Sequence, residues 1–253
     1  MTKNPLVETI DRGNRIDRTR LHQQVADRIR AAILRGDLAP GDSLPTERDL
    51  SASFGVGRTS IREALRSLEA QGLVSLGAGG RWPAVVTTDV SGPFREMLVH
   101  LVRLERIGLA DVIELRTAVE SAAVTRAAQT PDPEQLKQAA RALREMQQQD
   151  LSLEDFDAAD VRFHVALVAA SGNPAMHLVI LAVSAAVATY LLDALRSVPN
   201  VRTTIRSLVD EHAAILQAID AGDGTLAATL VRDHIEGFYG RFMRGSVLSE
   251  RVR

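Results

Sequence analysis

Apolar residues near the start of the chain recur with the period of a helix. One apolar stripe runs from about Arg20 to Arg35, and Gly36 follows it as a stop signal. The stripe consists of Leu21, Val25, Ile29 and Ile33. Because these side chains share one helix face, the pattern predicts a helix that packs against the rest of a small domain.

Two shorter helices are predicted next. Thr46 is suited to cap a helix that runs through Phe54, and a further helix is expected from about Thr59 to Gln71. The segment 55–57, with two glycines, separates them, and Gly72 ends the second helix. Two helices joined by a tight, glycine-containing turn are typical of a helix-turn-helix.

After Gly72 the pattern changes to short extended runs. The runs LVSL at 73–76 and AVVTT at 84–88 are separated by glycine-rich residues 77–80, which predicts a small β-hairpin, or wing. The polar, helix-breaking stretch 87–93 then places a domain boundary.

From Pro93 onward the whole chain has a helical pattern with short interruptions. Connections this short make most neighbouring helices antiparallel, so the pattern predicts a helical bundle. The predicted helices cover residues 93–105, 108–128, 132–149, 153–170, 174–197, 201–220 and 223–244.

The predicted fold is therefore mainly α, with two domains of different kinds. Residues 1–17 are expected to form a flexible tail and residues 18–88 a winged helix-turn-helix domain. Residues 89–92 are expected to be a linker, and residues 93–253 an all-α antiparallel bundle.

Composition narrows the classes of function. Aromatic residues make up only 4% of the chain, which favours aliphatic helix packing over a β-sandwich. Without cysteine, any metal must be bound by histidine and carboxylate. No signal peptide or membrane-spanning stretch is evident, so we expect a cytoplasmic protein without a membrane partner. Residues 1–81 carry a net charge of +3 and the remainder −5, a direction that suits an N-terminal part that binds a polyanion.

The strongest motifs lie between residues 33 and 74. They read ILRGDLAPGDSLPTERDL at 33–50 and FGVGRTSIREALRSLEAQGLV at 54–74, and they resemble the winged helix-turn-helix of GntR-family regulators. The resemblance implies double-stranded DNA as partner, and specific sites for such domains are usually read by two-fold dimers. We therefore expect a homodimer and a palindromic operator.

The start of the second helix has the chemistry that DNA recognition needs. Its first turn offers two guanidinium groups, two hydroxyl groups and free backbone N–H groups, while the apolar residues of the helix fall on the opposite face. The resemblance assigns DNA contacts to Arg48, Arg58, Thr59, Ser60, Arg62 and the wing glycine Gly79. Gly57 stands where the family usually has a hydroxyl residue.

Candidate metal ligands occur on three predicted helices of the bundle. Asp160 and His164 lie one turn apart on one helix, and His212 and His234 lie on the last two long helices. If they converge, three imidazoles and a carboxylate form a site for zinc, with nickel or manganese as alternatives. A single histidine on a helix is more often a surface or core residue, so the residues alone leave convergence open.

A second resemblance supports that convergence. Residues 93–253 resemble the FadR C-terminal ligand-binding domain, FCD, and all four positions that bind metal in its metal-containing members are present. The matching segments are ELR at 114–116, Glu120, DVRFH at 160–164, ASGNP at 170–174, EH at 211–212 and His234.

Arg116 is the candidate for binding an effector. The FCD resemblance implies that it holds the carboxylate of a small organic acid, for which a guanidinium is the natural partner. The alternative is a simple intrahelical pair with Glu120 one turn later.

The function predicted is that of a DNA-binding transcription regulator, a repressor rather than an enzyme, whose operator affinity depends on an organic acid bound at the metal. Two alternatives remain. A His/Asp metalloenzyme would lack an evident general base and would leave the DNA-binding domain unexplained. A purely structural metal would join the helices without sensing an acid.

Overall fold

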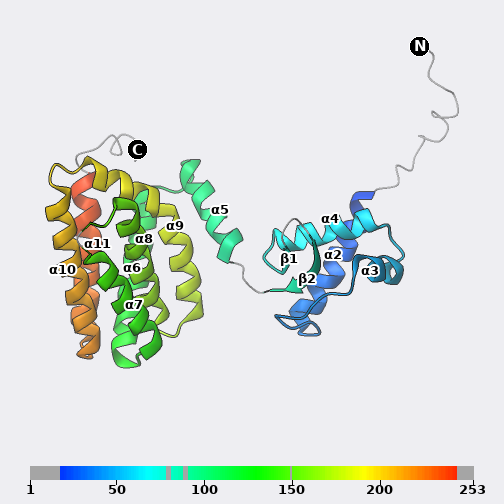
Figure 1. Ribbon diagram of the computed structural model, residues 1–253, viewed down its shortest axis with the longest axis horizontal. Coiled ribbons are helices and arrows are strands. Elements are labelled where there is room, and N and C mark those ends of the chain that lie inside the picture. The colour runs from blue at the N-terminus through cyan, green and yellow to red at the C-terminus, as the bar shows by residue number, and fades with distance from the viewer. Residues whose placement is uncertain (1–17, 78–80, 88–90, 149, 244–253) are drawn as a thin grey trace, which may run out of the picture. The chain divides into compact units, whose positions relative to one another are not determined.

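The computed structural model describes residues 18–77, 81–87, 91–148 and 150–243, and the predicted tail 1–17 lies outside these residues. The chain forms two compact units, Met1–Pro93 and Phe94–Arg253. Figure 1 shows helices and a hairpin in the first unit and a helical bundle in the second. The predicted class, mainly α with a winged helix-turn-helix and a bundle, is confirmed.

In the first unit, helices α2 (Arg18–Arg35), α3 (Glu47–Phe54) and α4 (Arg58–Glu69) enclose a small apolar core with a hairpin. Three of the four predicted stripe residues of α2 are buried, whereas Leu21 is exposed. The side chain of Thr46 caps α3 by accepting a hydrogen bond from the Asp49 backbone N–H at 3.2 Å, as the sequence predicted.

The hairpin consists of β1 (Val74–Gly77) and β2 (Arg81–Val86), paired antiparallel with Val74 opposite Val86. An isolated bridge from Ser43 to Val85 ties the loop before α3 to β2. The inward residues Val74, Ala84 and Val86 join the core formed by α2 and α4. The hairpin is thus held against the helices from one side.

Helix α5 (Ser91–Arg103) begins three residues before the second unit, which contains the rest of it. The unit also contains α6 (Leu109–Gln129), α7 (Pro133–Met146), α8 (Leu153–Ala169), α9 (Pro174–Ser197), α10 (Val201–Asp220) and α11 (Gly224–Met243). Helix α6 packs against α8, α9, α10 and α11, and its residues are buried on more than one face. A helix surrounded in this way brings its polar residues to the centre of the bundle.

Helix α5 begins at Ser91, so the last two residues of the predicted linker 89–92 are helical. Pro93 does not prevent this, because the N–H groups of a first helical turn have no partner within the helix. Elsewhere Asp132 and Asn173 cap α7 and α9, each followed by a proline at the first helical position.

Among the described helices, no single one is long and apolar enough to cross a membrane. The two parts of α9, Pro174–Ala188 and Tyr190–Ser197, form an angle of 41°. Only the two parts together have the length and apolar composition of a membrane span.

Candidate DNA-binding surface and metal site

The turn between α3 and α4 is set by glycine. Gly55 adopts φ +67°, a left-handed conformation that a side chain would strain, and its N–H closes α3 on the Ser51 carbonyl. The Ser51 hydroxyl donates a hydrogen bond to the Val56 carbonyl at 2.5 Å. Gly57 precedes α4 and has no side chain, so it does not cap the N–H groups of the first turn of α4.

One face of α4 is buried and the opposite one is exposed. Ile61, Ala64, Leu65 and Leu68 are buried, as the sequence predicted. Arg48, Arg58, Thr59 and Arg62 are exposed, and Ser60 is partly buried. The predicted contact residues therefore gather at the start of α4 and in α3, except Gly79, which lies outside the described residues.

An ion pair links the two helices of the motif. The Nε of Arg62 donates to both carboxylate oxygens of Glu47, each at 2.9 Å. Arg48 is 80% exposed and has only Asp49, 3.6 Å away, as its ion-pair partner among the described residues. The exposed arginines are thus accessible to an anionic partner such as DNA.

In the second unit, the four residues predicted to bind metal come together. Ligand atoms of Asp160, His164, His212 and His234 lie within 4.8 Å of one another, and all four residues are buried. Helix α8 supplies the first two, α10 the third and α11 the fourth. The bundle therefore closes residues 74 positions apart into one cluster.

The spacing within the cluster suits a single ion. His212 Nε2 lies 3.2 Å from His164 Nε2 and 3.2 Å from Asp160 Oδ1, while His164 Nε2 lies 3.8 Å from Asp160 Oδ1. Metal–ligand bonds of about 2.1 Å place neighbouring ligand atoms about 3.0–3.4 Å apart, so the residues fit a first-row divalent metal. The Nδ1 atom of His212 is buried and has no hydrogen-bond partner among the described residues.

A carboxylate behind His164 fixes which of its nitrogens faces the cluster. His164 Nδ1 lies 2.6 Å from Glu120 Oε2, and the other oxygen of Glu120 accepts from Arg116 Nε, also at 2.6 Å. A carboxylate in this position favours the tautomer with its proton on Nδ1, which leaves the lone pair of Nε2 for the cluster. Arg116 and Glu120 are 4% and 0% exposed, so this chain of contacts is excluded from water.

His234 has a similar carboxylate partner. Its Nδ1 lies 2.7 Å from Glu211 Oε2, and Glu211 also accepts a hydrogen bond from Ser207 at 3.0 Å. The Glu211 side chain is 32% exposed, unlike that of Glu120. Two of the three histidines are therefore oriented by carboxylates, an arrangement common around metal ligands.

Burial and the neighbouring charges set the protonation states. Burial opposes ionisation of Glu120, but the adjacent His164 and Arg116 lower its pKa to about 2. Burial likewise opposes ionisation of Asp160, yet His164 and His212 hold its pKa below the usual range. Burial lowers the pKa values of His212 and His234. Carboxylates that stay ionised and histidines that stay neutral are the forms that bind a metal cation.

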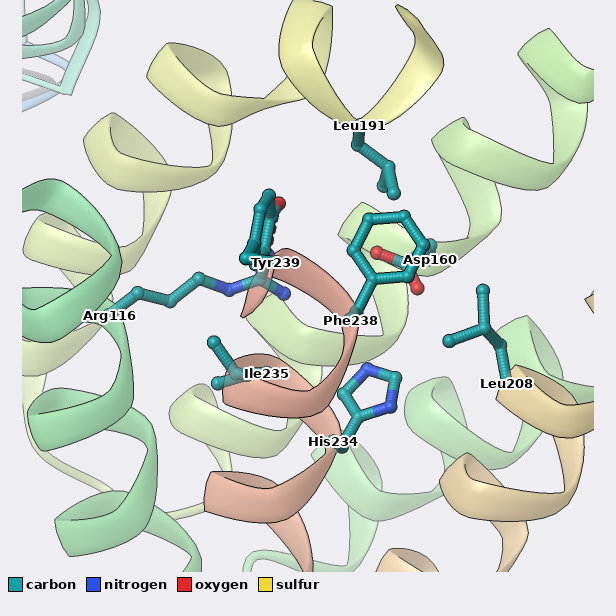
Figure 2. Close-up of a pocket in the computed structure, with 8 residues that line it drawn as sticks. All are labelled: Arg116, Asp160, Leu191, Leu208, His234, Ile235, Phe238 and Tyr239. Carbon is teal, nitrogen blue, oxygen red and sulfur yellow. Dashed lines mark hydrogen bonds between the residues drawn. The ribbon is translucent and has the colours of Figure 1, made fainter. Parts of the chain in front are cut away.

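The cavity beside the cluster is small. Figure 2 shows Arg116, Asp160, His234 and Tyr239 around it, with Leu191, Leu208, Ile235 and Phe238 completing its lining. Its volume is about 10 Å³, close to that of one water-sized sphere. Arg116 donates to the Tyr239 hydroxyl at 3.3 Å. The intrahelical Arg116–Glu120 pair, which the sequence left as an alternative, is present.

Several residues at this site were not among the predicted binding residues. Glu120 and Glu211 act as hydrogen-bond partners of the histidines, and Tyr239 contacts Arg116 across the bundle. Asp157 has a buried oxygen without a hydrogen-bond partner among the described residues, and burial, together with Asp160, raises its pKa to about 6. Glu120 and Glu211 were in the matched motifs, but Tyr239 carried no sequence signal.

The two units define a class of protein. A winged helix-turn-helix with an exposed, arginine-bearing second helix is a DNA-binding module, and the helical unit carries a buried cluster that could bind a metal. The chain thus has the architecture of a DNA-binding transcription regulator.

Comparison with known proteins gives the particular family. Residues 21–82 match the family described as bacterial regulatory proteins, gntR family, and residues 111–237 match the FCD domain. The HTH-type transcriptional repressor NanR of Salmonella newport is 32% identical over 247 residues, covering 93% of this chain and 90% of the relative. The NanR of Cronobacter sakazakii is 30% identical over 230 residues, covering 88% and 85%. The chain belongs to the GntR family of regulators and has an FCD C-terminal domain.

A solved structure supports the same fold. Streptococcus agalactiae GntR superimposes with a TM-score of 0.58 and 24% sequence identity, covering 85% of this chain and 98% of the other. Because the relatives are transcription regulators and not enzymes, the metalloenzyme alternative is set aside. The family match also implies that the chain binds DNA.

Proposed function

We propose that this chain is a repressor whose affinity for its operator is controlled by a small organic acid bound beside a divalent metal in the FCD domain. The observation that carries the proposal is the buried convergence of Asp160, His164, His212 and His234 in a chain that also has a DNA-binding unit. Relatives named as repressors support the direction of regulation.

For the DNA interface, the proposal assigns base and phosphate contacts to the first turn of α4. Arg58, Thr59 and Arg62 are exposed there, while the buried face of the helix holds it on the core. Arg48 on α3 and the wing glycine Gly79 complete the proposed set. A single unit of this size offers a small interface, which favours a homodimer that reads two half-sites of a palindrome.

For the metal, the proposed ligands are Asp160 Oδ1 and the Nε2 atoms of His164, His212 and His234. Three imidazoles and one carboxylate favour zinc, and nickel or manganese also accept this donor set. Such an ion supplies a Lewis-acidic centre to which a carboxylate oxygen of the effector can bind. If the ion is purely structural, it will stabilise the bundle without any response to acids.

For the effector, the proposal assigns its second contact to Arg116. Apart from the Nε bond to Glu120, the guanidinium donates one hydrogen bond to a described residue, the 3.3 Å contact with Tyr239, so its terminal nitrogens can donate to a new partner. A cavity of about 10 Å³ does not hold an organic acid, so binding requires that Tyr239 and its neighbours move. That movement, on α11 and against α6, is the proposed link to the position of the DNA-binding units.

The DNA interface is tested with Arg58→Ala. A duplex selected from a random pool by the wild-type protein is titrated by fluorescence anisotropy at fixed salt. Loss of a bidentate base contact is expected to weaken binding about 10-fold or more. Arg141→Ala, which removes an exposed arginine from α7 in the second unit, is the matched control and is expected to bind as the wild type does. Wild-type affinity for Arg58→Ala would contradict the assignment.

The sensing claim is tested by adding citrate, malate, lactate and succinate to that complex. At least one acid is expected to release the DNA from metal-loaded protein and to have no effect after treatment with EDTA. Arg116→Lys keeps the charge but loses the fork-shaped pair of donors, so its response to the active acid should be weaker. A panel without effect on protein that contains stoichiometric metal would favour the structural role.

A further inference from the structure

Helices α10 and α11 lie side by side in the bundle (Figure 1). A groove lined by residues of both helices follows their junction. Its volume is about 620 Å³, and its lining includes His234 and three carboxylates: Asp210, Glu211 and Asp233. Among the four clustered residues, His234 alone lines both this groove and the internal cavity. His234 therefore lies between the groove and the rest of the cluster.

The internal cavity has a different lining on its other sides. Leu191, Leu208, Ile235 and Phe238 surround it there, and a hydrated cation would lose favourable contacts with water along such a path. Carboxylates around the outer groove attract cations and can replace water ligands one at a time. The groove side of His234 therefore favours the passage of a cation, whereas the cavity side does not.

We propose that the divalent metal enters and leaves its site through the α10–α11 groove, and that Glu211 is the positioning residue that holds His234 with Nε2 towards the ion. The inference rests on the proposed metal site and adds a route and a residue to it. It also separates the metal route from the Arg116 side, where the effector is proposed to bind.

Glu211 differs from the other carboxylate partner, Glu120, in a way that suits this role. Glu120 is completely buried and bound to Arg116, so its movement would leave the buried Arg116 charge without a partner. Glu211 is one-third exposed at the groove and is shared between His234 and the Ser207 hydroxyl. A carboxylate in this position can turn outward to meet an incoming ion and then return to orient the ring.

The experiment follows Co²⁺ binding to full-length protein stripped with EDTA. Visible absorbance in a stopped-flow instrument gives the loading rate, and competition with a chelator gives the equilibrium affinity. Three variants are compared with the wild type: Glu211→Gln, the double variant Asp210→Asn with Asp233→Asn, and Glu236→Gln. Glu236 is the matched control, because it is an exposed acid on α11 that lines the surface shared with α6.

Glu211→Gln is expected to weaken Co²⁺ affinity about 10- to 100-fold, the usual effect of losing a carboxylate behind a metal-binding histidine. Circular dichroism and urea unfolding of the stripped variant should match the wild type, which separates positioning from a structural role. The double variant is expected to load several-fold more slowly at low salt, with rates converging at high salt because screening removes the steering. Glu236→Gln should load as the wild type does.

Two results would overturn the inference while leaving the metal site intact. One is wild-type affinity in Glu211→Gln, and the other is slow loading in Glu236→Gln with normal loading in the double variant. A wild-type protein that binds no Co²⁺ would overturn the proposed metal site and this route with it.

Discussion

At the scale of single residues, the second unit depends on buried charges that satisfy one another. Arg116, Glu120 and Asp160 are each at most 4% exposed, and histidine side chains lie between the two carboxylates. Removing one member of such a set leaves a buried charge without a partner, which costs more than the intact pair contributes. Substitutions of exposed charged residues nearby are expected to have little effect on stability.

Arg116→Ala is expected to lower the free energy of unfolding by about 3–5 kcal/mol, because Glu120 would remain buried without its guanidinium. Arg141→Ala is the control, since Arg141 and Glu145 form an exposed pair with the same spacing of four residues. Its expected cost is about 0–1 kcal/mol. Urea unfolding of metal-free protein measures both, and equal costs would contradict the role given to burial.

Acid is expected to destabilise the metal-free protein. Burial lowers the pKa values of His212 and His234 below their ordinary 6.5, so the unfolded chain takes up protons first as the pH falls. The stabilisation from keeping these rings neutral is complete above pH 6.5 and is lost as the pH falls towards their folded-state pKa values. Glu120, with a pKa of about 2 against an ordinary 4.5, adds a further loss below pH 4.5.

Urea unfolding at pH 7.5, 6.5 and 5.5 in EDTA checks this expectation. The free energy of unfolding should decrease mainly between pH 6.5 and 5.5, and His234→Gln, which removes one titrating ring, should reduce that decrease. A free energy that is constant over this range would show that the buried rings do not titrate as their burial requires.

At the scale of elements, the close approach of α11 to α6 brings His234 within reach of the residues behind the cluster. Gly224 makes this approach possible, because a Cβ there would lie 2.8 Å from the Thr125 carbonyl oxygen. The Thr125 hydroxyl also donates to the Gly224 carbonyl at 3.2 Å. The first residue of α11 is therefore fixed against the backbone of α6.

Gly224→Ala is expected to cost about 1–3 kcal/mol, because the backbone of one helix must shift to admit the methyl group. Gly237→Ala on the same helix is the matched control, since its Cβ would meet nothing within 4 Å. There alanine should stabilise the helix by up to about 1 kcal/mol. A lower unfolding temperature for Gly224→Ala and a higher one for Gly237→Ala would support the close approach. An unchanged unfolding temperature for Gly224→Ala would refute it.

At the scale of the whole molecule, the candidate metal-binding cluster and the candidate DNA-binding surface lie in different compact units. Metal that binds only the folded second unit stabilises that unit by mass action, by about 2.7 kcal/mol at 100 times the dissociation constant. The first unit contains none of the proposed ligands and has the only tryptophan of the chain, Trp82, in β2. The two units can therefore be observed separately.

Zinc is expected to raise the unfolding temperature measured by circular dichroism, which reports mainly the bundle helices. The transition measured by Trp82 fluorescence should shift much less. In a His164→Ala, His212→Ala double variant, zinc should shift neither transition. Equal shifts by both probes in the wild type would show that the units unfold together.

Most elements of the fold could be predicted from the sequence, because helix and strand periods and glycine or proline stops are local properties. Helix α10 begins and ends at the predicted residues, and α4 begins one residue early. Strand β2 starts at Arg81 rather than Ala84, because pairing across the hairpin with Gly77 extends it. Such pairing is a property of two segments and cannot be seen in either one alone.

The sequence by itself determined the types of the two units and one pair of candidate ligands, since Asp160 and His164 share a helix face through their spacing alone. Tertiary structure decided that His212 and His234 reach them, that Arg116 is tied to Glu120, that Glu211 faces a groove, and that the cavity is small. These features depend on how four helices pack, and packing joins residues that no local period relates.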